Sequence, residues 1–333
     1  MSPTVTLPRR RTGTGEIVVE ARDLKRYYDV GGGLFGGGGL VKALDGVSFK
    51  LESGKTLAVV GESGCGKSTL ARLVTMIEEP TDGTLLIDGE PVGESTPELR
   101  RKMQIVFQNP YGSLNPRQKI GAILEEPLVI NTKDNAATRR AKAINMMERV
   151  GLRAEHYERY PHMFSGGQRQ RIAIARALII RPDLILFDEA VSALDVSVRA
   201  QILDLLAELC SAYDLTYLFI SHDLSVVRTV TDRVLVMKSG EIVEEGATEA
   251  VFDAPQHPYT QALLSAIPRL EDDRPQHIRL SGEVPTPVNL PSGCVFHGRC
   301  PHANARCKQE IPALRTQDDG TRVACHAVEE GRL

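Results

Sequence analysis

The residues best suited to chemistry in this 333-residue chain form a glycine-rich loop that ends in a lysine and a serine. The loop follows the pattern G-x-x-x-x-G-K-[ST], and its members are Gly61, Glu62, Ser63, Gly64, Cys65, Gly66, Lys67 and Ser68, with Thr69 directly after them. Glycines let the backbone curl so that its N–H groups and the N-terminus of a following helix face an anion. Lys67 adds a positive charge for β- and γ-phosphates, and the Ser68 hydroxyl is a suitable Mg²⁺ ligand. The pattern predicts a P-loop that binds a nucleoside triphosphate.

A pair of acids at the end of an apolar run forms the second chemical feature. Asp188 and Glu189 directly follow the apolar residues 184–187, which are expected to form a buried strand. Carboxylates at the carboxyl end of a parallel strand lie where ligands bind in open α/β sheets. Asp188 suits Mg²⁺ coordination through water, and Glu189 suits a general base that polarises an attacking water molecule. Acidic strand ends are often only solvated, but the apolar run and the upstream P-loop favour the catalytic interpretation.

Three further polar features could contribute to the same site. A Ser-Gly-Gly-Gln turn opens a helical stretch and predicts a second anion-binding helix N-terminus, at Ser165, Gly166, Gly167 and Gln168. Gln108 begins a polar loop, punctuated by proline and glycine, directly after a short apolar strand. His222 stands at the polar tip of another apolar strand. A γ-phosphate contact and an ordinary surface histidine fit this position equally well, so residue type alone leaves the role of His222 open.

These groups need an alternating α/β framework to position them. A buried strand at 56–60 enters the P-loop and a helix at 68–77 leaves it, which is the context that the motif requires. The glycine-rich segment 31–39 is expected to be a loop. Further helices are expected at 120–152, 169–180 and 196–213, and further strands at 16–21, 24–28, 41–44, 47–51, 83–89, 103–107, 184–188, 216–222 and in a hairpin at 234–246.

Composition limits the classes of partner. The 43 acidic and 40 basic residues leave a net charge of −3, so no basic field predicts nucleic-acid binding. No apolar run approaches the roughly 20 residues needed to cross a bilayer. The run Arg9–Arg11 is followed by polar residues instead of the apolar core of an export signal. We therefore expect a protein on the cytoplasmic side of the membrane, which would serve a membrane by docking to it.

Taken in order, these motifs resemble the ATP-binding subunits of ABC transporters over about residues 16–250. The shared set comprises the P-loop at 61–68, a glutamine loop at Gln108, the signature at 164–168, a Walker B strand at 184–188 with Glu189, an Asp loop at 192–195 and a switch histidine at His222. The segments 41–49, 107–116 and 257–260 and the cysteine-bearing tail further resemble the oligopeptide/dipeptide importer branch, and within it the F-type ATPase subunits of dipeptide permeases. Phe164 stands where the signature more often has leucine, and Ala190 stands where proline usually follows the base; neither change removes a reactive group.

The resemblance implies a fold and a division of the chain. It implies a P-loop NTPase cassette of the α/β class at residues 16–255, with a RecA-like core, an antiparallel β subdomain and a helical subdomain at about 109–168. A flexible tail at 1–15 precedes the cassette, and a small loop-rich extension with cysteines follows it at 256–333. The resemblance also assigns adenine stacking to Tyr28, which residue type alone does not separate from Tyr27 or from a core aromatic.

The same resemblance implies cofactors and partners. Mg²⁺ would be held by Ser68, Gln108 and Asp188, and His222 would contact the γ-phosphate. Each ATP would lie between the P-loop of one subunit and Ser165, Gly166 and Gly167 of a second, paralogous ATPase in a heterodimer. Gln168 and Asp195 are further expected nucleotide-binding residues. Two transmembrane permease subunits would send a coupling helix to the helical subdomain, and an extracytoplasmic peptide-binding protein would deliver cargo. No nucleic-acid partner is implied, and the expected location is the cytoplasmic face of the membrane.

Four of the six cysteines lie in the tail, at Cys294, Cys300, Cys307 and Cys325. A reducing cytosol argues against disulfides. Zinc is an option, although its usual cysteine pairs, spaced by two to four residues, are missing here. Four thiolates on a loop-rich segment also suit a [4Fe–4S] cluster. The importer branch carries such a cluster in this extension, so the resemblance ranks iron–sulfur first, zinc second and free thiols third.

Two other functions stay open beside a motor for dipeptide or oligopeptide uptake. The first keeps the importer architecture and changes the cargo to nickel, glutathione or another small solute, since cargo is chosen by proteins outside this chain. The second is an ABC ATPase that acts on nucleic acid or ribosomes. Such proteins typically carry tandem cassettes, coiled coils or a basic face, and this chain shows one cassette and no coiled-coil heptads.

Overall fold

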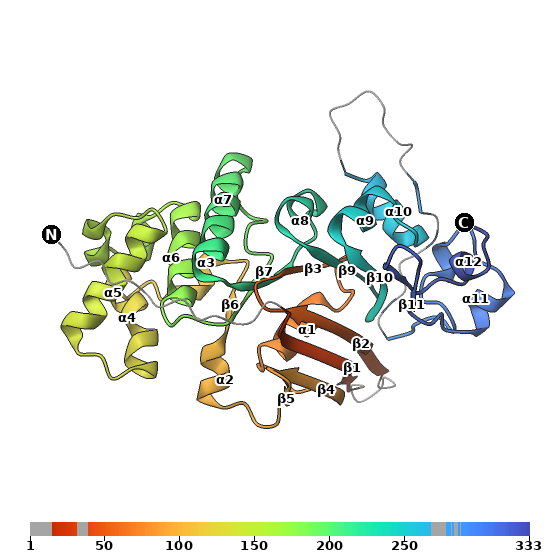
Figure 1. Cartoon of the computed structure of the whole chain (residues 1–333), viewed down its shortest axis with the longest axis horizontal. Helices are drawn as coiled ribbons and strands as arrows, with labels where there is room; N and C mark the ends of the chain where they lie inside the picture. Colours follow the sequence, from red (N-terminus) through yellow and green to blue (C-terminus); the bar gives the residue numbers. More distant parts are fainter. Residues whose placement is uncertain (1–14, 32–38, 268–277, 281, 283–285, 287) are drawn as a thin grey trace. The chain divides into compact units, whose positions relative to one another are not determined.

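The computed structural model describes residues 15–31, 39–267, 278–280, 282, 286 and 288–333, with the side chains of residues 110 and 111 left aside. The expected N-terminal tail and most of the expected glycine-rich loop lie outside these residues. The chain divides into two compact units, which are described separately (Figure 1). The first unit consists of Met1–Val18, Leu51–Lys55 and Glu94–Tyr217, and the second of Val19–Lys50, Thr56–Gly93 and Leu218–Leu333.

One sheet of the second unit is a four-stranded antiparallel sheet in the order β2-β1-β4-β5. Its strands are β1 (Ile17–Val30), β2 (Gly39–Glu52), β4 (Asp82–Ile87) and β5 (Glu90–Pro91). Two strands were expected at 41–51, but β2 is continuous. Gly46 has φ +91°, a conformation that suits glycine, so the chain passes through the irregularity without ending the strand. The sheet confirms the antiparallel β subdomain.

The other sheet of the second unit carries the P-loop. Its strands run in the order β11-β12-β10-β9-β3-β8, with β3 (Thr56–Val60) parallel to β9 (Arg233–Lys238). Four of the five β3 residues are buried, as expected for a central strand of a parallel sheet. The hairpin from β9 to β10 (Glu241–Ala247) turns through Ser239 and Gly240, which have φ +48° and +87°. The remaining core elements are β8 (Thr216–Ile220), α1 (Lys67–Val74), α8 (Leu224–Val230), α9 (Thr248–Asp253) and α10 (Pro258–Ser265).

The C-terminal extension continues this sheet. Strand β12 (Arg322–Val323) pairs antiparallel with β10, with Val323 opposite Glu244, and β11 (Arg315–Thr316) pairs with β12. Arg322 also donates to the buried Glu245 carboxylate of β10 at 2.8 Å. The extension adds η3 (His297–Arg299), α11 (Ala305–Gln309) and α12 (His326–Glu329). The described part of the extension is therefore built into the unit that holds the P-loop.

The first unit combines a pair of parallel strands with a group of helices. Strand β6 (Met103–Val106) pairs with β7 (Leu184–Asp188), with Met103 opposite Leu184. The helices are α2 (Pro97–Lys102), α3 (Pro110–Ser113), α4 (Ile120–Asn131), α5 (Ala136–Arg149), η1 (Ala154–Glu158), η2 (Pro161–Met163), α6 (Gly166–Leu178) and α7 (Val196–Tyr213). Helix α4 packs against both α5 and α6 (Figure 1). The helices from α3 to η2 lie within the range of about 109–168 where the helical subdomain is expected.

The predicted helical stretch at 120–152 consists of two helices. Asn135 begins the second, because its side chain accepts a hydrogen bond from the Thr138 N–H at 2.9 Å. Met146 and Met147 are buried on one face of the second helix, and Gly151 ends the stretch with φ +76°. Among the described residues, no helix has an apolar stretch long enough to cross a bilayer.

Candidate functional site

The P-loop runs between β3 and α1 in a conformation that requires its glycines. Gly61 and Gly66 have φ +152° and +109°. A Cβ at Gly61 would lie 2.2 Å from the Met237 carbonyl oxygen, and one at Gly66 would lie 2.4 Å from the Ala43 carbonyl oxygen. Backbone atoms cannot move aside as a flexible side chain can, so these two positions admit only glycine.

The lysine of the P-loop lies inside the turn. The Lys67 Nζ donates to the carbonyl oxygens of Gly61 at 2.8 Å and Glu62 at 3.0 Å, and the side chain is 6% exposed. Ser63, Gly64 and Ser68 are exposed on the loop, and Thr69 is half-buried. This arrangement places a cation, N–H groups and a hydroxyl at one helix N-terminus, which suits a phosphate with a bound Mg²⁺.

Cys65 occupies a variable position of the P-loop pattern and lies inside the loop. The thiol is buried, and burial raises its pKa despite the neighbouring Lys67. A thiol with a raised pKa is a poor nucleophile at neutral pH.

Tyr28 makes two contacts of its own in strand β1. Its hydroxyl donates to the Glu78 carboxylate, and the Arg26 guanidinium lies 4.7 Å from the ring centroid. Tyr27 instead donates to Asp45. The two tyrosines are thus held by different partners, and adenine stacking by Tyr28 stays a prediction.

His222 is exposed on the turn between β8 and α8. The following Asp223 begins α8, because its carboxylate accepts from the backbone N–H of Ser225 at 3.1 Å and of Val226 at 3.4 Å. The turn therefore has a defined geometry, and the imidazole stands at its exposed face. Contact with a γ-phosphate stays a prediction.

In the first unit, the acids at the end of β7 are joined to the glutamine loop. Glu189 has φ +49°, a left-handed conformation that a side chain-bearing residue rarely adopts. The Ser192 N–H and Oγ both donate to the Glu189 carbonyl oxygen, at 3.1 and 2.8 Å. The Gln108 Nε2 donates to the same Ser192 Oγ at 3.3 Å. The turn that carries the candidate base is hydrogen-bonded, although Ala190 replaces the usual proline.

Asp195 occupies the N-terminal cap position of α7, where its carbonyl oxygen accepts from the Arg199 N–H at 2.8 Å. The Arg199 guanidinium also donates to the carbonyl oxygens of Ser192 at 3.5 Å and Leu194 at 3.3 Å. Arg199 thereby fixes the Asp loop between β7 and α7, a role that no motif indicates.

The signature turn is an ordinary capping box at the start of α6. The Ser165 Oγ accepts from the Gln168 N–H at 3.4 Å, and the Gln168 side chain accepts from the Ser165 N–H at 3.1 Å. Phe164 is buried and packs edge-on against His156, with ring centroids 5.2 Å apart. The substitution of phenylalanine for leucine is therefore a packing difference, as the sequence predicts.

A cavity of about 420 Å³ brings the elements of the first unit together. Its lining includes Gln108, Gly166, Gln170, Ala190 and Leu194. The Gln170 amide is fully buried and has no hydrogen-bond partner among the described residues. Buried amides are normally hydrogen-bonded, so the Gln170 amide is available to solvent or a ligand in the cavity. Sequence patterns indicate no role for Gln170, because it lies inside a helix and outside the motifs described above.

The four tail cysteines lie near one another in the extension. The Cys294 N–H donates to the Cys307 carbonyl oxygen at 2.8 Å. Burial raises the pKa of Cys294 to about 12, and the other three thiols act in the same direction. All six cysteines of the chain, which lie in its described part, are thiols and not disulfides. Among the described residues, no group of three or more His, Cys, Asp or Glu side chains is arranged to hold a metal ion.

Comparison with known protein families matches two parts of the chain. The ABC transporter family matches residues 44–192, and the family described as oligopeptide/dipeptide transporter, C-terminal region, matches residues 243–307. The P-loop, glutamine loop, signature and acidic pair all fall within the first match.

Curated relatives match the chain over nearly its whole length. The dipeptide transport ATP-binding protein DppF of Haemophilus influenzae is 59% identical over 94% of this chain and 97% of the relative. DppF of Escherichia coli is 58% identical over 94% of this chain and 95% of the relative. The oligopeptide transport ATP-binding protein AppF of Bacillus subtilis is 48% identical over 93% of this chain and 97% of the relative. The expected likeness to dipeptide-permease ATPases of the F type is confirmed.

Solved structures match the fold. The CbiO1 subunit of the ABC transporter complex CbiONQ from Clostridium perfringens has a TM-score of 0.63 and 28% identity, covering 72% of this chain and 92% of that chain. The cassette MJ0796, in a dimeric post-hydrolysis state bound to ADP and Pi, has a TM-score of 0.61 and 30% identity, covering 69% and 98%. The expected cassette with β and helical subdomains is confirmed.

Proposed function

The chain belongs to the ABC transporter ATP-binding proteins of the oligopeptide/dipeptide type, and from this premise we propose that it hydrolyses ATP to drive peptide uptake by a membrane importer. The observation that carries the proposal is the 59% identity to a dipeptide transport ATP-binding protein over 94% of the chain, extension included. Cargo is chosen by proteins outside this chain, so the preference for peptides over nickel or glutathione rests on relatives of 56–59% identity that are named for dipeptide or di/tripeptide transport.

The roles of the site residues follow from their chemistry. Lys67 and the backbone N–H groups of the P-loop bind the β- and γ-phosphates. The Glu189 carboxylate orients and polarises the attacking water as general base, and His222 contacts the γ-phosphate through its exposed imidazole. Oxygen donors are the ligands that Mg²⁺ prefers, and Ser68, Gln108 and Asp188 supply a hydroxyl, an amide and a carboxylate. The bound Mg²⁺ neutralises charge on the phosphates.

A second ATPase subunit completes the site in this proposal. The MJ0796 cassette, which is 30% identical to this chain, is described as a dimer bound to ADP and Pi. In the same way, we propose, Ser165, Gly166, Gly167, Gln168 and Asp195 serve an ATP held by the P-loop of a paralogous subunit. The signature offers a helix N-terminus whose free N–H groups suit a phosphate.

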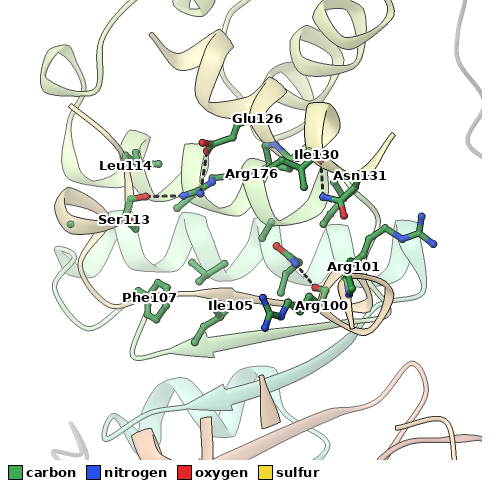
Figure 2. A pocket seen from close by; sticks show the side chains of 18 residues that line it. Arg100, Arg101, Ile105, Phe107, Ser113, Leu114, Glu126, Ile130, Asn131 and Arg176 are labelled. Atoms are coloured by element: carbon green, nitrogen blue, oxygen red, sulfur yellow. Dashed lines mark hydrogen bonds and ion pairs between the residues drawn. The ribbon is translucent and has the colours of Figure 1, made fainter. Parts of the chain in front are cut away.

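A groove in the first unit is the proposed docking surface for a permease helix at the cytoplasmic face of the membrane. It has a volume of about 740 Å³ and is lined by α2, β6, α3, α4 and α6 (Figure 2). Ile130 and Phe107 are 75% and 43% exposed there, and Arg100 and Arg101 lie at one rim. Figure 2 shows Arg176 directed at Glu126 and at the Ser113 carbonyl oxygen, where it donates at 3.4 and 2.8 Å. Apolar floor and basic rim suit an amphipathic helix with acidic residues.

The four tail cysteines form the proposed site of a [4Fe–4S] cluster, with zinc as the second choice. Support for this ranking comes from the family resemblance and from the spacing of the cysteines, which lacks the close pairs that zinc usually takes. When bound, the cluster cross-links four points of a loop-rich segment. Visible absorption with iron and acid-labile sulfide analysis on anaerobically purified protein tests the assignment: zinc without sulfide, or no metal, contradicts it.

Reconstituted transport tests the function as a whole. The complete importer, with its permeases, partner ATPase and binding protein, is placed in vesicles that contain ATP. We expect uptake of a labelled dipeptide that requires ATP and that stops when Glu189 is replaced by glutamine. Uptake of nickel or glutathione, with no uptake of any dipeptide or oligopeptide in the same vesicles, would overturn the peptide cargo.

A further inference from the structure

Glu62, at a variable position of the P-loop, is held by groups from four other parts of the second unit. Its N–H donates to the Tyr259 hydroxyl at 2.8 Å, and its carbonyl oxygen accepts from Lys67 at 3.0 Å. Its carboxylate accepts from Lys238 of β9 and from Arg299 of the extension. Burial alone would raise the pKa of Glu62, but Lys238 and Arg299 hold it below its ordinary value. Each polar group of this residue therefore has a partner.

Arg299 belongs to the cysteine-bearing part of the extension. It ends η3, lies between Cys294 and Cys300 and directly precedes Cys300. Its Nη1 lies 3.3 and 3.2 Å from the two Glu62 carboxylate oxygens, and its side chain is only 11% exposed. A guanidinium buried to this extent loses much of its hydration, so its contact with a carboxylate is worth more than a surface ion pair.

Aromatic packing joins the same two regions beside the ion pair. Phe296, three residues before Arg299, packs on Tyr259 with ring centroids 5.5 Å apart, and both rings are buried. The Lys238 Nζ lies 5.0 Å from the centroid of the Tyr259 ring. Glu62, Lys238, Tyr259, Phe296 and Arg299 thus form one cluster, which we call the Glu62 cluster. Two of its five members come from the segment between the first two tail cysteines.

We propose that Arg299 is a positioning residue for nucleotide binding, through which the cysteine-bearing extension holds the P-loop in its phosphate-binding shape. The P-loop needs fixed positions for its N–H groups, and misplacement of about 1 Å at such a site costs large factors in function. Glu62 is the second residue of the loop and contacts Lys67 directly, so a shift of Glu62 moves the lysine that binds phosphate. This inference rests on ATP binding alone and not on the peptide cargo.

Glu62→Gln distinguishes two ways in which the Glu62 cluster could affect nucleotide binding, namely by holding the P-loop in position or by its net charge alone. The cluster holds two cations and one carboxylate, so it is net positive. If the cluster acted only through its field, Glu62→Gln would add positive potential and strengthen binding of a polyphosphate. If it acts by position, Glu62→Gln releases both Lys238 and Arg299 and weakens binding. We expect the second result.

The experiment measures the dissociation constant of the purified full chain for trinitrophenyl-ATP with Mg²⁺, together with the midpoint of thermal unfolding. Arg299→Met and Glu62→Gln are each expected to weaken binding about tenfold, the factor that loss of one charged hydrogen bond produces. The double variant is expected to be no weaker than the worse single variant, because both changes break one interaction. Arg299→Lys, which keeps the charge, should recover part of the affinity.

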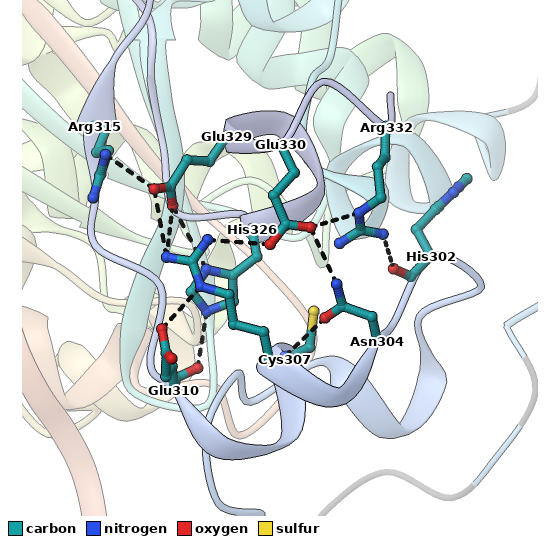
Figure 3. A network of polar contacts seen from close by, with 10 residues as sticks. His302, Asn304, Cys307, Glu310, Arg315, His326, Glu329, Glu330 and Arg332 are labelled. Atoms are coloured by element: carbon teal, nitrogen blue, oxygen red, sulfur yellow. Dashed lines mark hydrogen bonds and ion pairs between the residues drawn. The ribbon is translucent and has the colours of Figure 1, made fainter.

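Arg306→Met is the matched control, because Arg306 also precedes a tail cysteine and also pairs with carboxylates. Its partners Glu310, Glu329 and Glu330 lie within the extension, as Figure 3 shows. This variant should lower the unfolding midpoint and leave the dissociation constant within about twofold. It separates weakening of the extension from displacement of the P-loop.

Three results would overturn the inference. One is unchanged affinity in Arg299→Met, another is tighter binding in Glu62→Gln, and the third is a loss in Arg306→Met as large as that in Arg299→Met. If Arg299→Met does not fold, Arg299→Lys and Glu62→Gln carry the test. Loss of peptide uptake with normal nucleotide affinity would count against the proposed function and not against this inference.

Discussion

Two glycine-bearing turns precede helices in this protein, one at α1 and one at α6, and they are built differently. The P-loop glycines Gly61 and Gly66 have left-handed φ values and lie against backbone carbonyls. The signature turn is closed by an ordinary Ser165–Gln168 capping box. At Gly166 an added Cβ would meet nothing closer than a Leu194 methyl carbon at 3.8 Å.

The difference shows which glycines the fold itself demands. Gly66 is required by the conformation and packing of its own unit, so any protein with this P-loop shape would keep it. Gly166 has room for a side chain, and Ala is the better helix former. The fold of this chain therefore does not explain Gly166, whereas close approach of a nucleotide held by another subunit would. The P-loop glycines are thus explained by contacts within their own unit, whereas Gly166 is explained only by the proposed nucleotide of another subunit.

The largest expected effect separates chemistry from binding. Replacing Glu189 with glutamine keeps the size of the side chain and removes its basicity, so turnover should fall by about 10²–10⁴-fold. Binding of trinitrophenyl-ATP should change little, because the P-loop lies elsewhere in the chain. ATPase assays and nucleotide titrations on the same preparation measure both quantities. Normal hydrolysis in this variant would remove Glu189 from the role of base.

Gly66→Ala and Gly166→Ala test the contrast directly. The first should weaken nucleotide binding about 100-fold, because the new Cβ meets the Ala43 carbonyl and displaces the loop. The second should leave binding to the isolated chain within about twofold and lower ATPase activity only in the assembled transporter. Equal loss of nucleotide affinity in the two isolated variants would contradict the proposed difference between the turns.

Much of this architecture could be predicted from the sequence, because the motifs combine fixed spacing with local periodicity. The strand and helix around the P-loop and the 234–246 hairpin occur as expected. The P-loop can be recognised from residue order alone, since its glycines, Lys67 and Ser68 lie within eight consecutive residues.

Contacts between distant segments could not be predicted in this way. Glu62 and Arg299 are 237 residues apart, and neither occupies an invariant position of the P-loop pattern. The fully buried Gln170 and the turn-fixing Arg199 lie in helices whose periodicity reports burial but not partners. The sequence predicts two strands at 41–44 and 47–51, whereas β2 is one strand that continues through Gly46. These features depend on contacts between residues far apart in the sequence, and the residue pattern of one segment does not identify such contacts.

Gly167 offers a smaller test within the signature. A Cβ there would lie 2.4 Å from the Val198 Cγ1 of α7, a side-chain atom instead of a backbone atom. Gly167→Ala should therefore destabilise the protein by about 1–3 kcal/mol through overpacking. Val198→Ala removes the obstructing methyl group, so the double variant should recover most of the loss. Urea unfolding of the two single variants and the double variant measures this recovery, and additive losses would show that another contact excludes the side chain.

The smallest effect concerns acid sensitivity in the unit that holds the P-loop. Burial lowers the pKa of His257 to about 3, and the neutral Nδ1 accepts from the Tyr259 N–H at 3.0 Å at the start of α10. Between pH about 6.5 and 3 the unfolded chain binds a proton at this position that the folded chain refuses, so the free energy of unfolding falls as pH falls. Within this range, the protonation of His257 in the unfolded chain lowers the free energy of unfolding by about 1.4 kcal/mol for each pH unit.

His257→Asn keeps a capping acceptor and removes the titration, since asparagine is a good N-terminal cap. We expect the variant to lose stability less steeply than the wild type between pH 6.5 and 5, measured by urea unfolding at fixed ionic strength. Above pH 7 both proteins bind no proton here, so their difference should be constant and should report packing alone. Parallel pH profiles below 6.5 would show that His257 is protonated in the folded protein. In that case the packing of Tyr259 against Phe296, and not the His257 hydrogen bond, would hold the Tyr259 ring that contacts Glu62.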